Sequence, residues 1–242
     1  MTTLVSNIIT VPDAEAGRNI FQLDDLADKG VYKAMLHLRH QHHGSNELPP
    51  HQQRVAAISV IEASKDGEVK MPPLECSGDD EAELLRAWCD SLGHVTEHVA
   101  WDLHGLTVAK LRLLKHGISC PALHRVSERA DEGPLQTQLA GGCEAELASL
   151  TELAAMLEIP AMPALSAEGL LAHWQAGDHA NIQQFSDYRV LQTWLIQQRY
   201  AHQRGDISGR ELAERHVSLS AVLNDSKQEH LQQFATGMQT YD

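Results

Sequence analysis

Histidines concentrate in one short stretch of the sequence, and imidazole is a common ligand of transition metals. His40, His42 and His43 follow one another closely, and His37 and His51 lie nearby. Such imidazoles could bind zinc or nickel. Their spacing matches no structural zinc pattern, however, and no cysteine lies close to them. We therefore favour a solvated helix end and loop here, and keep a metal site as the alternative.

A second set of polar side chains lies in residues 4–13, whose sequence is LVSNIITVPD. Apolar, β-branched residues closed by Pro12 are typical of a buried strand that ends in a turn. In α/β domains, ligands usually bind beyond the carboxyl end of such a strand. This strand offers a ligand Asn7, Thr10 and Asp13, but no carboxylate within the apolar run.

With residues 14–18, this stretch resembles the first motif of the predicted PolB-like 3'-5' exonucleases, which belong to the DnaQ-like group of the RNase H-like fold. The family strand has the sequence Phe-Asp-Ile-Glu-Thr-Val-Pro-Asp, and its Asp and Glu hold two divalent metal ions. Here Asn7 stands at the Asp position and Ile9 at the Glu position. The Thr-Val-Pro-Asp ending is kept as Thr10 to Asp13.

Two central stretches extend the resemblance. Residues 48–61 are similar to the family's Leu-Pro-x-His-Gln-x-Arg-Val lead into its second strand. Residues 106–118 end in Lys-His-Gly-Ile, as the family does, and counting back from this ending puts Gly105 at a metal-binding Asp. Asp102 is the only acid nearby, and a family Asp-Leu-Met-Asp segment would fall at residues 134–137, where no acid is kept.

The clearest resemblance is to the C-terminal part of the family, over residues 149–208. The family's Tyr-Cys-Glu-x-Asp-Val-Leu motif supplies a tyrosine and an acid to the exonuclease site. The corresponding positions are Phe185 and Arg189 here, and Asp187 matches only the acid between them.

The resemblance implies chemistry that these residues do not support. A two-metal nuclease holds Mg or Mn ions about 3.5–4 Å apart, and such hard cations need several carboxylate oxygens. The catalytic set is degenerate at Asn7, Ile9, Gly105, Phe185 and Arg189. We therefore expect a catalytically inactive homologue, a pseudoenzyme with no bound cofactor. It would act in nucleic-acid binding or as a protein scaffold.

The alternative is a residual metal-dependent 3'-5' exonuclease acting on single-stranded DNA or RNA. It would use Asp13, Asp102 and Asp187 with Mg or Mn. Asp102 and Asp187 are thus candidate metal ligands of the nuclease, whereas His40, His42 and His43 are candidates for the separate histidine site.

Charge bears on the partner. Lys and Arg total 19 against 33 Asp and Glu, which gives a net charge of −14. A field of this sign repels nucleic acid on average. Thr10, Lys115 and Arg189 are the candidate nucleic-acid contacts, but the net charge favours a protein partner or a homo-oligomer. No apolar run of membrane-spanning length is present, which predicts no membrane association.

The cysteine content and the length of the chain indicate its cellular compartment and its fold class. Four cysteines without a CxxC pair favour reduced thiols in a cytoplasmic protein: Cys76, Cys89, Cys120 and Cys143. The chain has 242 residues, 43% of them hydrophobic, which is enough for a buried core. We expect one α/β, RNase H-like (DnaQ-like exonuclease) domain over residues 1–242, with a mixed central sheet flanked by helices.

The elements that position these side chains follow from apolar periodicity. Residues 1–123 form the sheet-containing half, with strands at 4–13, 55–61, 69–74 and 95–101 and helices at 24–43, from 77 or 79 to 92, and up to 116. A polar loop is expected at 125–133. Residues 146–240 form the helical half, with a long helix at 179–204 and later helices at 208–223 and 226–237.

Overall fold

A four-stranded mixed sheet lies at the centre of the molecule, in the order β3-β2-β1-β4. The structure is a computed structural model and describes residues 2–74, 80–128, 133–140, 148–161 and 165–238. Strand β1 (Thr2–Pro12) pairs antiparallel with β2 (Gln53–Ser64) and parallel with β4 (Glu97–Ala100). The short β3 (Val69–Lys70) pairs antiparallel with β2 at one edge.

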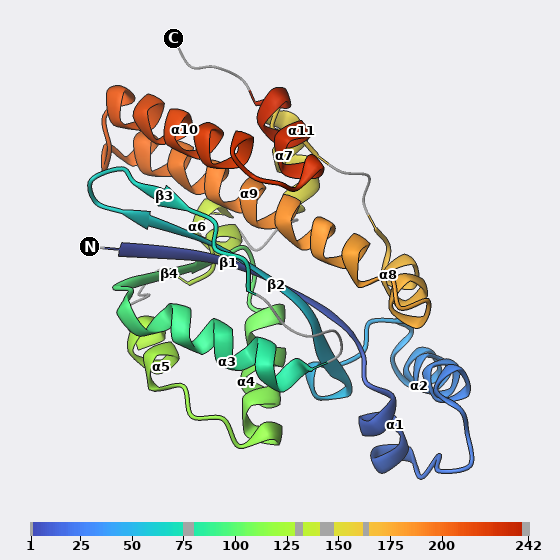
Figure 1. The fold of residues 1–242 in the computed structure, drawn as a ribbon. Helices are drawn as coiled ribbons and strands as arrows, with labels where there is room; N and C mark the ends of the chain where they lie inside the picture. The colour runs from blue at the N-terminus through green and yellow to red at the C-terminus, as the bar shows by residue number, and fades with distance from the viewer. Residues whose placement is uncertain (1, 75–79, 129–132, 141–147, 162–164, 239–242) are drawn as a thin grey trace.

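Helices cover both faces of the sheet (Figure 1). On one face lie α3 (Glu81–Ser91), α4 (His104–His116) and α5 (Pro121–Glu128). On the other, α9 (His179–Arg204) runs across the strands, with α10 (Gly209–Asn224) and α11 (Glu229–Gly237) beside it. This is the α/β arrangement with a helical C-terminal half that the sequence predicted.

The remaining helices are shorter or lie at the ends of the sheet. In Figure 1, α1 (Ala14–Phe21), α2 (Asp28–His43) and α8 (Ala167–Gln175) lie beyond the carboxyl end of β1. The others are α6 (Leu135–Ala140) and α7 (Leu150–Met156), and two single turns of 3-10 helix at Pro50–Gln52 and Leu92–His94. No helix in the described ranges is long and apolar enough to cross a membrane.

The alternation of side chains along β1 divides the core into two layers. Because successive side chains of a strand point to opposite faces, Leu4 packs in the cluster with Trp88 and Val108 of α3 and α4. Val5 packs in the other cluster, with Trp194 of α9. The same alternation turns Asn7 and Ile9 towards α9, where they contact Ser186 and Phe185.

Several expected boundaries were wrong, and the reasons are physical. The loop expected at 125–133 gives way to α5 up to Glu128, because a proline is favoured at the first helical position and Leu123 is buried in the core. The strand expected at 69–74 ends after Lys70, before the two prolines that cannot donate to a ladder. The helix expected from residue 24 begins at Asp28. The helix starts expected at 77 or 79 lie outside the described residues, and Asp80 caps α3.

Candidate functional site: a cleft between β1, α4 and α9

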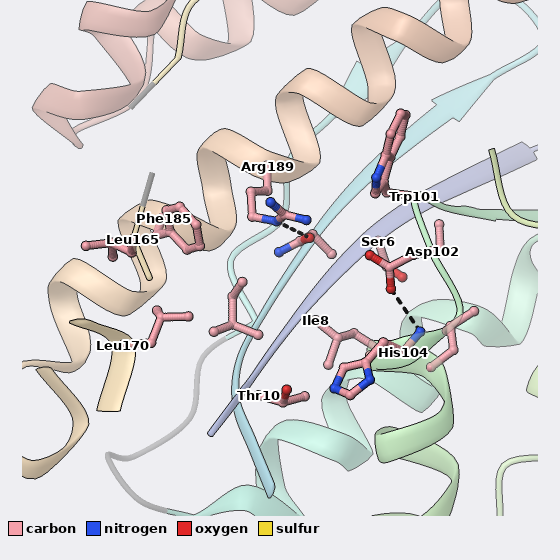
Figure 2. Close-up of a pocket in the computed structure, with 15 residues that line it drawn as sticks. Ser6, Ile8, Thr10, Trp101, Asp102, His104, Leu165, Leu170, Phe185 and Arg189 are labelled. Atoms are coloured by element: carbon pink, nitrogen blue, oxygen red, sulfur yellow. Dashed lines mark hydrogen bonds between the residues drawn. The ribbon is translucent and has the colours of Figure 1, made fainter. Parts of the chain in front are cut away.

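A cleft of about 310 Å³ opens where β1, the start of α4 and the N-terminal half of α9 meet. All five positions that the sequence identified as degenerate line it: Asn7, Ile9, Gly105, Phe185 and Arg189. They lie far apart in the sequence, and the fold brings them to one place. Figure 2 shows the cleft, with Arg189 reaching from α9 towards the strand.

Arg189 and Asn7 join the two elements across the cleft. The Nε of Arg189 donates to Oδ1 of Asn7 at 3.3 Å, and Nδ2 of Asn7 donates to Oγ of Ser186 at 3.2 Å. The Asn7 amide therefore accepts one hydrogen bond and donates another. An asparagine can make both contacts because its amide carries one oxygen acceptor and one NH2 donor.

The guanidinium of Arg189 is partly withdrawn from water. Burial lowers its pKa, and the charge of Asp102 acts in the opposite direction. The side chain also lies against Phe185, with its guanidinium carbon 5.7 Å from the ring centroid. Arginine stays ionised at any working pH, so a fixed positive charge occupies this end of the cleft.

Negative charge in the cleft comes from one side chain. Of the lining residues that the structure describes, only Asp102 carries a carboxylate. Its Oδ1 accepts from the backbone N–H of His104 at 2.9 Å, at the first turn of α4 (Figure 2). The carboxylate therefore stabilises a helix N-terminus.

The chain was compared with known proteins. Residues 45–238 match the model of a family described as a predicted 3'-5' exonuclease related to the exonuclease domain of PolB. The chain belongs to this family. No curated protein and no solved structure matched.

The match begins after β1, so the family model does not itself cover Asn7 and Ile9. Their placement in the exonuclease motif depends on the resemblance of the strand sequence. Their position in one cleft with Gly105, Phe185 and Arg189, which lie within the matched residues, supports that placement.

Gly105 has no room for the acid that the family motif would put there. A Cβ atom at this position would lie 2.8 Å from the carbonyl oxygen of Ile8 and 2.9 Å from its Cβ. Contacts this short require a shift of α4 or of β1. The first turn of α4 thus packs directly on the strand, and a Gly105→Asp substitution alone would not rebuild a metal site.

Asp187, a candidate ligand of the residual nuclease, does not line this cleft. It lies two residues from both Phe185 and Arg189, and residues two apart on a helix do not share a face. Its buried carboxylate accepts from Ser59 Oγ at 2.6 Å and pairs with His230 Nε2 at 2.9 Å. Asp102 and Asp187 are therefore not brought together.

Asp13 and Lys115 belong to a separate charge network at the end of β1. The Asp13 carboxylate pairs with Arg112 and lies 3.3 Å from Nζ of Lys115. Lys115 also pairs with Glu15 at 2.6 Å. Neither residue lines the cleft, so Asp13 is not placed to complete a metal cage and Lys115 is not placed to contact a ligand there.

The histidine patch lies at the end of α2. His40, His42 and His43 occupy its last turn, where positive charge suits the helix dipole. In the described part of the chain, no group of three or more His, Cys, Asp or Glu side chains is arranged to hold a metal ion.

The sequence did not single out four polar side chains in or beside the cleft: Ser6, His98, His104 and Gln53. Ser6 Oγ lies 2.7 Å from Nε2 of His98, on neighbouring strands. His104 Nε2 and Thr10 Oγ1 both contact Oε1 of Gln53, at 3.2 and 2.6 Å. The expected candidate Thr10 thus lines the cleft with its hydroxyl already bonded. The partners in each pair are distant in sequence, and no local sequence pattern predicts these contacts.

Proposed function

We propose that this chain is a non-catalytic member of its exonuclease family, whose remodelled cleft binds the end of a nucleic-acid strand. The contact between Arg189 and Asn7 is the observation that supports the loss of catalysis. It puts a guanidinium and an amide where the family motif implies two acids. A fixed cation at this point repels the dications that the reaction needs.

The remaining acid does not replace the missing set. Asp102 offers one carboxylate, which already accepts from the first turn of α4. Two hard dications need several carboxylates to offset their charge. Asp13 and Asp187 are paired elsewhere, so a residual nuclease built on these three acids has no common site.

The binding role is supported by what faces the cleft. A phosphate in the cleft would meet the charged guanidinium of Arg189. Arg189 forms no ion pair among the described residues, so its charge is available to a ligand. The net charge of −14 limits the affinity, and we expect binding without strong sequence preference.

The catalytic part of the proposal is tested by incubating the protein with end-labelled single-stranded DNA and RNA in Mg or Mn. We expect no shortening by the unchanged protein or by Asp102→Asn. Shortening that Asp102→Asn abolishes would overturn the proposal, because a contaminating nuclease would be unaffected by the substitution.

The binding part is tested by fluorescence anisotropy with a labelled single-stranded oligonucleotide. Losing one charge-assisted contact costs about 1.5–3 kcal/mol, so Arg189→Gln should weaken binding by a factor of roughly 10 or more. Arg189→Lys should retain most of the affinity. Arg210→Gln, on the exposed face of α10, is the matched control.

Equal weakening by Arg189→Gln and Arg210→Gln would place the binding outside the cleft. No binding by the unchanged protein would remove the nucleic-acid role and leave a protein scaffold as the function to examine.

A further inference from the structure

A second pocket, of about 630 Å³, adjoins the cleft beyond the carboxyl end of β1. Its other walls come from the end of α2, from residues 46–50 and from the start of α8. The cleft and this second pocket share three wall residues, all labelled in Figure 2: Thr10, His104 and Leu170. A ligand bound in the cleft can therefore continue across this shared wall into the second pocket.

The walls of the second pocket are mainly apolar. They include the side chains of Leu36, Leu48, Pro49 and Leu171. Such a surface favours the flat face of an uncharged ring over a hydrated ion, because burying a charge without a partner is costly. The volume lies within the range of small-molecule sites, which is roughly 300–1,000 Å³.

The buried polar side chain of this pocket already has its partners. Gln53 accepts from Thr10 Oγ1 at 2.6 Å and donates to the carbonyl oxygen of Leu48 at 2.5 Å. His104 Nε2 lies 3.2 Å from the same Gln53 oxygen. The second pocket therefore offers a base an apolar surface, rather than a set of free hydrogen-bonding groups that would distinguish one base from another.

The charged side chains disfavour a phosphate in the second pocket. Glu47 and Glu168 line it with one guanidinium, that of Arg39, whose Nε donates to the carbonyl oxygen of Glu47 at 2.8 Å. Two negative charges thus stand against one positive charge. In the cleft, the guanidinium of Arg189 stands against the single carboxylate of Asp102. A strand end is therefore expected to place a phosphate in the cleft and an uncharged base in the second pocket.

We propose that the second pocket holds an unpaired nucleobase at the end of the strand whose phosphate lies in the cleft. This inference rests on the function proposed above and specifies its ligand as an unpaired strand end. A base must leave its pair and its stack to enter such a pocket, which costs free energy in a duplex. Single-stranded DNA and RNA present the same unpaired bases, so both are ligands of this kind.

The role of the base is tested by fluorescence anisotropy with three internally labelled single strands, each made as DNA and as RNA. One is complete, one lacks two bases at each end, and one lacks four bases in the middle. Losing the end bases should weaken binding by about fivefold, the lower end of the range for one stacked base, because the walls here are aliphatic. Losing the middle bases should have little effect.

Two substitutions on α8 test where the base lies. Ala167 lines the second pocket, whereas Ala172 lines neither the pocket nor the cleft, and both residues are exposed. Ala167→Glu adds a carboxylate to the pocket wall, and Ala172→Glu adds the same charge to the same helix outside it. Ala167→Glu should weaken binding of the complete strand by a similar factor and reduce the further loss caused by missing end bases. Ala172→Glu should bind as the unchanged protein does, and circular dichroism checks that both variants are folded.

Arg189→Gln separates this inference from the proposed function. If Arg189→Gln weakens binding while the two strands with missing bases bind equally, the cleft binds the strand and the inference about the second pocket is wrong. Equal effects of Ala167→Glu and Ala172→Glu would also overturn it, as would a blunt duplex that binds as tightly as the complete single strand. No binding of the complete strand would overturn both the inference and the nucleic-acid role on which it rests.

Discussion

Replacing Arg112 by methionine is expected to destabilise the protein strongly, because this arginine joins two buried carboxylates. Its Nε lies 2.9 Å from both carboxylate oxygens of Glu81, its Nη2 lies 2.5 Å from Oε2, and its Nη1 pairs with Asp13. The side chains of Arg112, Glu81 and Asp13 are 7%, 3% and 4% exposed. The network connects the end of β1 with α3 and α4.

The magnitude follows from what remains after the substitution. Methionine fills a similar volume but leaves two buried carboxylates without their shared cation. Asp13 keeps Lys115 at 3.3 Å, and Glu81 keeps His116 at 3.0 Å. Breaking a buried ion pair by removing one partner costs about 3–5 kcal/mol. For a chain of this size, that corresponds to a loss in Tm of roughly 6–20 °C.

The assay is urea unfolding at neutral pH, followed by circular dichroism. Arg112→Met should lower the free energy of unfolding by about 3–5 kcal/mol. The stability of Arg112→Lys should lie between those of Arg112→Met and the unchanged protein, because lysine keeps the charge but loses the fork of donors. Arg210→Met is the control, since Arg210 is 87% exposed in a surface pair. It should leave the urea midpoint unchanged.

The pH dependence separates the electrostatic cause from a packing defect. Burial acts to raise the pKa of Asp13, but the charge and hydrogen bond of Arg112 outweigh it and lower the pKa overall. In the unchanged protein this contribution is present above the unfolded pKa of about 3.9, and is lost as the pH falls through the folded pKa.

Without Arg112, burial raises the pKa of Asp13, so the variant loses stability as the pH rises. The difference between the two proteins should therefore narrow as the pH falls from 7 to about 4. A destabilisation below about 1 kcal/mol at pH 7, or a difference independent of pH, would refute the reasoning.

Two further predictions concern the cleft and the core. Gly105→Ala should destabilise the protein by about 1–3 kcal/mol, because its Cβ would lie 2.8 Å from the carbonyl oxygen of Ile8. Gly93→Ala, with nothing within 4 Å of its Cβ, is the control in the same urea titration, and equal effects would contradict the close packing. Burial lowers the pKa of both His98 and His216 to about 4, with nearby Lys110 and Arg199 acting in the same direction. Their ring resonances should therefore stay unchanged above about pH 5 in NMR titrations, and stability should fall as the pH drops below the unfolded pKa of about 6.5. A midpoint above pH 6 for either ring would contradict this.

Local patterns were sufficient for much of the fold. The helix expected at 179–204 is α9, with the same bounds, because Asp178 caps its start and Gly205 adopts the left-handed conformation after its end. Short elements were predicted less well. The length of β3 and the existence of α5 depended on prolines and on burial, which apolar periodicity alone does not weigh.

The sequence also contained the reason why Asp187 does not line the cleft. Phe185 and Arg189 are four residues apart on one helix and share a face, whereas Asp187 is two residues from each. Helical geometry alone therefore separates Asp187 from the other two. The motif makes Asp187 a candidate ligand, but a motif does not show which face of the helix a side chain occupies.

The sequence by itself determined the class of fold and the family, and it predicted which side chains stand at the motif positions of the expected acids. These properties depend on local periodicity and on residue identity at motif positions. Only the tertiary structure decided that Asn7 meets Arg189 across 182 positions and that Gly105 packs on Ile8. Such contacts arise where strands and helices cross, and their distances depend on the packing of the whole core rather than on any neighbouring residues.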